Sequence, residues 1–108
     1  MLKEIVEKCA LIGIHEKRRI EDDYCELVFY SKHTDEWQNI FKNILGAAVK
    51  PAGQKPSKED IRLTESYGGV YGDQVLFKKE IPDYTLIAMF WPWQDNVHTT
   101  LKMALLKK

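Results

Sequence analysis

The sequence predicts an α+β fold, namely a two-layer sandwich in which two helices pack on a mainly antiparallel sheet that ends in a three- or four-stranded β-meander. Three observations predict it. Two segments before residue 46 repeat apolar residues at helical spacing, residues 74–106 hold strand-like apolar runs, and short polar turns separate those runs. A single α+β domain over residues 1–108 is expected, because this length suits one hydrophobic core.

Two helices are expected in the first half of the chain. The first is predicted from about Leu2 to Ile14, where apolar residues recur every three or four positions. Its alternative is a strand that starts at Ala10, because Gly13 lowers helix stability by about 1 kcal/mol relative to alanine. The second helix is predicted from about Asp35 to Leu45, with Thr34 as its N-terminal cap.

The segment between these helices predicts one connection and one buried strand. His15 to Asp23 carries mostly charged side chains and is expected to be a solvated connection. Tyr24 to Ser31 has apolar residues on both faces of a strand, interrupted only by Glu26. We therefore expect this strand to be covered on both sides.

The middle of the chain is the least regular segment. Gly46 to Lys58 is rich in proline and glycine and is expected to be an exposed loop whose lysines, Lys50 among them, face water. Ser57 to Asp60 is typical of a helix start, whereas the residues up to Tyr67 alternate between apolar and polar as a strand does. We expect a single helical turn and then a strand, with a helix as the alternative.

Three further runs predict the antiparallel meander. They are Gln74 to Glu80, Tyr84 to Trp93 and Val97 to Leu106. The middle run is apolar on both faces, so we expect a central strand. The last run alternates between apolar and polar residues, which predicts one solvent-facing side and a position near a sheet edge.

Composition disfavours several classes of partner. Sixteen Lys and Arg residues balance sixteen Asp and Glu residues, so nucleic acid is not expected as a partner. The longest apolar run, Leu86 to Trp93, is far shorter than the roughly 20 residues of a membrane-spanning helix. The first residues lack a signal-peptide pattern, so we expect a soluble, cytoplasmic protein in which Cys9 and Cys25 are reduced, buried thiols.

Two segments supply the candidate binding residues. Trp91-Pro92-Trp93 can form a rigid aromatic platform that binds a flat ligand or a partner. The alternative is that one tryptophan belongs to the core and the other covers it at the end of the strand. Tyr67 to Gly72 holds three glycines and two tyrosines, which is typical of a close approach to a ligand or of a hairpin loop. Whether the two segments meet is left open. The candidate ligand- or partner-binding residues are Tyr67, Tyr71, Trp91, Trp93 and His98.

The histidines and cysteines do not indicate a metal site. They are scattered and fit none of the short spacings of zinc ligands, so no metal ligand and no cofactor are assigned. His98 and Asp95 beside Thr99 or Thr100 have the residue types of a general-base site, but these polar residues are also expected simply to face water. We therefore assign no catalytic residues and do not favour an enzyme.

The function expected from these patterns is binding. The sequence predicts a noncatalytic binding or assembly module that uses an aromatic-rich sheet face or strand end, with another copy of the chain or another protein as its partner. The alternative is a small-molecule-binding protein or small enzyme with a pocket near Tyr67 to Gly72 and Trp91 to Trp93.

Overall fold

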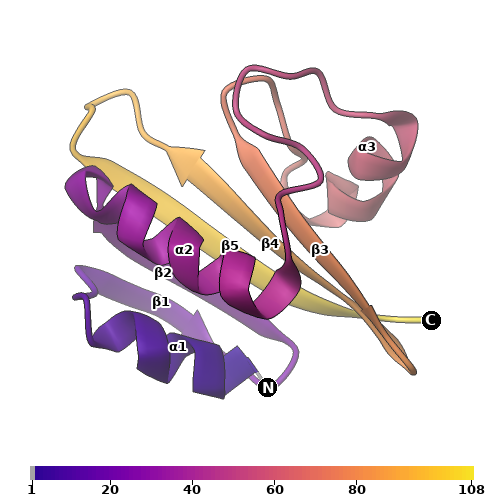
Figure 1. The fold of residues 1–108 in the computed structure, drawn as a ribbon, viewed down its shortest axis with the longest axis horizontal. Helices are drawn as coiled ribbons and strands as arrows, with labels where there is room; N and C mark the ends of the chain where they lie inside the picture. The colour runs from indigo at the N-terminus through magenta and orange to yellow at the C-terminus, as the bar shows by residue number, and fades with distance from the viewer. Residues whose placement is uncertain (1) are drawn as a thin grey trace.

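One five-stranded antiparallel sheet organises the structure, a computed structural model that describes residues 2–108. The strand order is β1-β2-β5-β4-β3 (Figure 1). Strands β3, β4 and β5 are consecutive antiparallel neighbours, so the predicted meander is confirmed. The strands span Glu16–Ile20 (β1), Tyr24–Tyr30 (β2), Val75–Ile81 (β3), Tyr84–Pro92 (β4) and His98–Lys107 (β5).

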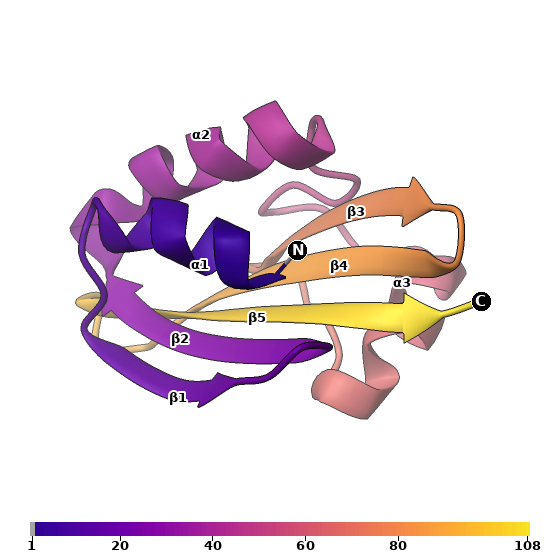
Figure 2. The ribbon, with the colours of Figure 1, turned by 90° about the horizontal axis from the view of Figure 1, so that it is seen from below.

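Residues 2–108 form three α-helices, which lie on the two faces of the sheet. Helices α1 (Leu2–Ala10) and α2 (Thr34–Leu45) cover one face, called the inner face here. Helix α3 (Lys58–Thr64) lies on the opposite, outer face (Figure 2). The predicted α+β sandwich of helices on an antiparallel sheet is thus confirmed. None of the helices within the described residues is long and apolar enough to span a membrane.

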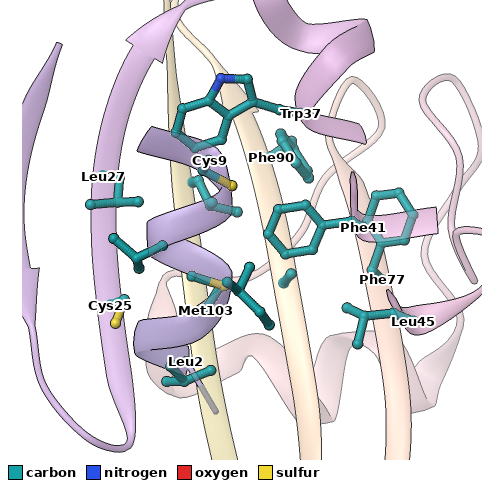
Figure 3. Close-up of a cluster of buried hydrophobic side chains, with 14 of the residues drawn as sticks. Leu2, Cys9, Cys25, Leu27, Trp37, Phe41, Leu45, Phe77, Phe90 and Met103 are labelled. Atoms are coloured by element: carbon teal, nitrogen blue, oxygen red, sulfur yellow. The ribbon is translucent and has the colours of Figure 1, made fainter. Parts of the chain in front are cut away.

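The main core lies between the inner face and the helices α1 and α2 (Figure 3). Phe29 of β2 stacks on Trp37 of α2, with ring centroids 4.1 Å apart. Phe41 of α2 meets Phe90 of β4 edge to face at 5.3 Å. These fully buried rings fix the position of α2 on the sheet, because aromatic pairs combine a large buried area with a preferred geometry.

Both cysteines belong to this core. Cys9 and Cys25 are buried free thiols, as predicted. Burial raises the pKa of Cys9 to about 12, because an apolar environment disfavours the thiolate. The two cysteines therefore contribute apolar packing in this fold rather than reactive sulfur.

The predicted helices are confirmed with corrected boundaries. Helix α1 ends at Ala10, earlier than predicted, yet Ile12 and Ile14 still pack against the main core as irregular chain. The alternative strand from Ala10 does not form. Helix α2 matches its prediction closely, although His33 rather than Thr34 occupies the N-cap position.

Strand β1 was not predicted, because His15 to Asp23 was interpreted as a solvated connection. All five residues of β1 are exposed, so the strand has no apolar alternation. Backbone pairing with β2, from Glu16 opposite Val28 to Ile20 opposite Cys25, holds it at the sheet edge instead. Charged side chains on an edge strand also discourage unwanted strand pairing.

The strand predicted before Tyr67 is wrong, because residues 58–64 form α3 and a 3₁₀ turn, Glu65–Tyr67, follows. A capping box starts this helix: Asp60 N donates to the Ser57 hydroxyl at 3.0 Å, and Ser57 N donates to the Asp60 carboxylate at 2.9 Å. This reciprocal pair satisfies two backbone N–H groups and outweighs the strand-like alternation.

The position predicted for the last strand is also wrong. Strand β5 lies in the middle of the sheet, between β2 and β4. Its polar residues reflect the outer face, which α3 covers only in part, and not a sheet edge. A half-covered central strand and an edge strand have the same alternating sequence.

Lys50 was expected to face water but is 1% exposed. The backbone of Lys50 pairs with that of Leu76, a residue of β3. Its Nζ donates to the carbonyl oxygens of Pro51 and Gly72, each at 3.2 Å, and to that of Gln74. The ammonium group thereby ties the Gly46–Lys58 loop to the segment before β3.

We expect Lys50→Met to lower the free energy of unfolding by about 2–4 kcal/mol, because the variant keeps the alkyl chain but leaves buried carbonyl groups without a donor. Lys55→Met in the same loop is the control, because Lys55 is exposed. Urea unfolding measures both. Equal stability of the two variants would show that the carbonyl contacts of Lys50 do not stabilise the loop.

Candidate functional site

Strand register aligns the outward side chains of the sheet in rows. Alternate residues of β2, β5 and β4 point away from α1 and α2, because side chains alternate along a strand. One row joins Trp91, Thr100, Val28 and Glu16 through paired positions. The neighbouring row joins Met89, Lys102, Glu26 and Arg19 in the same way. On the outer face, the row that contains Trp91 and Thr100 therefore lies beside the row that contains the charged residues Lys102, Glu26 and Arg19.

Helix α3 and the turn after it cover only one part of this face. They lie below β3, β4 and the C-terminal part of β5 (Figure 2). Val70, Leu76, Ile87, Met89 and Ala104 form a second buried cluster there. The outer face over β1, the C-terminal part of β2 and the N-terminal part of β5 carries no helix of the described residues (Figure 2).

Four rings gather on this uncovered part, and we call them the aromatic surface: His15, Tyr30, Trp93 and His98. The His98 ring lies at their centre, with centroid distances of 4.8 Å to His15, 5.4 Å to Tyr30 and 4.9 Å to Trp93. His15 and Tyr30 are themselves 4.9 Å apart. Tyr30 is 40% exposed, so the cluster reaches solvent.

Asp95 fixes the orientation of His98. Its carboxylate lies 2.6 Å from His98 Nδ1 and accepts hydrogen bonds from the backbone N–H groups of Val97 and His98, at 2.8 and 3.0 Å. The His98 contact and these backbone donors lower the pKa of Asp95 to about 2. With Nδ1 engaged, Nε2 is the His98 nitrogen left for another partner.

Trp93 is also held in place. Its indole Nε1–H donates to the Thr100 hydroxyl at 2.7 Å, across the β4–β5 turn. The Arg18 guanidinium lies 5.4 Å from the centroid of the Trp93 ring. Arg18 in turn forms ion pairs with Glu16 at 2.7 Å and Glu26 at 3.5 Å. Fixed rings of this kind lose little conformational entropy on binding.

The glycine-rich loop does meet the tryptophan segment, at Trp91. Gly68 has a φ of 96°, and a side chain at this position would overlap the outer edge of the Trp91 ring. Lys102 Nζ lies 3.6 Å from the centroid of the Trp91 ring and donates to the carbonyl of Tyr67 at 3.0 Å. Burial lowers the pKa of Lys102, and the Glu26 carboxylate opposes that shift.

The five predicted residues fall into three places. Trp93 and His98 belong to the aromatic surface. Tyr67 and Trp91 contact Lys102 under the edge of α3, where Tyr67 also stacks on Tyr24 at 5.4 Å. Tyr71 is 62% exposed and lines a groove beside α3. The five predicted residues therefore do not line one common pocket.

The groove beside α3 has a volume of about 340 Å³. It is lined by Pro56, Ile61, Glu65, residues 68–70 and Tyr71. Its lining is mostly apolar, with the carboxylate of Glu65 among the polar groups. Neither Trp93 nor His98 lines it.

Sequence reasoning missed three members of the site: His15, Tyr30 and Arg18. His15 and Arg18 belong to the charged segment that was interpreted as a connection. Tyr30 was placed on a strand but not linked to His98, which lies directly opposite it in the β2–β5 register. The pairing of β2 with both β1 and β5 is the signal that would have found them.

No protein-family model, curated protein or solved structure matches this chain, so its function is argued from its own side chains. Within residues 2–108, no group of three or more His, Cys, Asp or Glu side chains is arranged to hold a metal ion.

We expect Gly68→Ala to destabilise the fold by about 2 kcal/mol, because alanine disfavours the positive φ and its methyl group would displace the Trp91 ring. Gly72→Ala is the matched control, because open space surrounds that position. Its effect should stay within about 0.5 kcal/mol. Thermal unfolding compares the two variants, and a Gly68→Ala variant as stable as Gly72→Ala would refute the strain at Gly68 and its contact with Trp91.

Proposed function

We propose that this protein is a noncatalytic assembly module that binds a second copy of itself through the aromatic surface. The observation that carries the proposal is the cluster of four rings on the part of the sheet that no helix of residues 2–108 covers. Large aromatic side chains dominate the binding energy of protein interfaces. Asp95 holds the His98 ring and Thr100 holds the Trp93 ring before any partner binds.

The charges around the rings favour a copy of the same chain over a polyanion. Arg18 and Lys102 lie on this face together with Glu16 and Glu26. A two-fold interface uses the same patch on both subunits, so charges of both signs on one patch can face each other across it. A nucleic-acid partner would instead meet the two glutamates, whose charge repels phosphate.

We expect Trp93→Ala to abolish self-association while lowering stability only slightly. Sedimentation velocity from about 2 to about 200 µM should show a rising sedimentation coefficient for the parent chain and a constant monomer value for the variant. Truncation removes the indole from the interface, whereas the main core on the other face is unchanged.

Tyr71→Ala is the control, because Tyr71 is an exposed aromatic residue outside the aromatic surface. It should associate like the parent chain. A parent chain that stays monomeric over the whole range would refute the proposal. Equal losses of stability and association in Trp93→Ala would assign Trp93 to folding instead.

A second candidate function is small-molecule binding in the groove beside α3. The groove volume of about 340 Å³ falls in the range of small-ligand pockets, and its apolar walls with one carboxylate suit an apolar amine. For this function Tyr71→Ala is the test variant and Trp93→Ala is its control. In a thermal-shift screen of small aromatic amines, stabilisation should disappear in Tyr71→Ala and persist in Trp93→Ala, and stabilisation lost in neither variant would place the ligand elsewhere.

A further inference from the structure

His15 and His98 are brought together by the β1-β2-β5 pairing, with Tyr30 between their backbones. Their ring centroids are 4.8 Å apart, with the ring planes inclined by 45°. Two imidazoles that bind one tetrahedral ion hold their centroids on the order of 5 Å apart, because each nitrogen lies about 2 Å from the ion. The observed separation matches that requirement.

His98 also has the second contact that metal-binding histidines make. In protein metal sites, the imidazole nitrogen that does not bind the ion usually donates to a carboxylate. Asp95 Oδ2 lies 2.6 Å from His98 Nδ1 and takes that role here. This contact sets the tautomer in which Nε2 carries the free lone pair.

One copy supplies only two such ligands. Among the described residues, His, Cys, Asp and Glu side chains form no group of three that would hold an ion. A structural zinc ion takes four ligands in tetrahedral geometry. A second copy related by two-fold symmetry would add its own two histidines to the same ion.

We propose that a Zn²⁺ ion bridges two copies of this chain, bound by His15 and His98 of each. The inference rests on the proposed function for the second copy, and it adds the ion and its four ligands. Arg18 lies over Trp93 and Lys32 over Tyr30, and the ion pairs of Arg18 with Glu16 and Glu26 reduce its repulsion of the metal. Tyr30 and Trp93 then form the apolar surroundings of the ion.

The test combines sedimentation with calorimetric titration of Zn²⁺ into protein first treated with EDTA. We expect Zn²⁺ to strengthen self-association at least about 10-fold, at one ion per two chains. His15→Gln and His98→Gln should each remove this effect. His33→Gln is the control, because His33 contacts Glu36 at the start of α2 instead, and it should behave like the parent chain.

A further variant tests the role of Asp95. Asp95→Asn keeps an oxygen for the backbone N–H groups of the turn but loses the charge beside His98. It should weaken Zn²⁺ binding by about 10-fold or more, as loss of such outer contacts does in metal sites. Trp93 fluorescence gives a second readout, because its ring lies 4.9 Å from that of His98.

Two results would overturn the metal bridge. Binding of one ion per chain without a change in mass is the first, and self-association that neither EDTA nor His98→Gln alters is the second. The second result would leave assembly through Trp93 intact. A chain that binds no zinc and never associates would remove both proposals.

Discussion

The pairing of β5 with both β2 and β4 is the constraint on which the rest of the structure depends. It joins the β1–β2 hairpin of the N-terminal half to the C-terminal meander in one sheet. The same pairing places His98 opposite Tyr30 and Thr100 opposite Val28. Both the inner core and the aromatic surface include residues from the two halves of the chain that this long-range pairing brings together.

The fold class could be predicted because burial leaves a periodic pattern. Helix α2 and the strands β2, β3 and β4 bury most of one face or both, so their apolar spacing marks them. β1 and α3 lacked that pattern. Backbone pairing holds β1, and a capping box starts α3, so both depend on hydrogen bonds that hydrophobic periodicity does not record.

The candidate site could be predicted only in part, for a related reason. Trp93 and His98 were found because they are close in sequence and of types that are rare on a plain surface. Their neighbours His15, Tyr30 and Arg18 come from the other half of the chain. Strand order decides which distant residues share a row, and a single sequence gives the alternation of a strand but not its neighbours.

The cations of the outer face lie over the aromatic rings of that face. Arg18, Arg19, Lys32 and Lys102 each lie within 6 Å of the centroid of an aromatic ring, over Trp93, Tyr24, Tyr30 and Trp91 in that order. Such contacts give the ring faces a polar covering in the free chain.

The cations that cover the rings are held differently at the two ends of the outer face. Lys102 is tied to the Tyr67 carbonyl and lies under the edge of α3, so the position of Trp91 is fixed within the fold. Arg18 and Lys32 are exposed side chains on the aromatic surface. The rings of Trp93 and Tyr30 are therefore covered by solvent-exposed side chains, whereas the ring of Trp91 is covered by a side chain held within the fold.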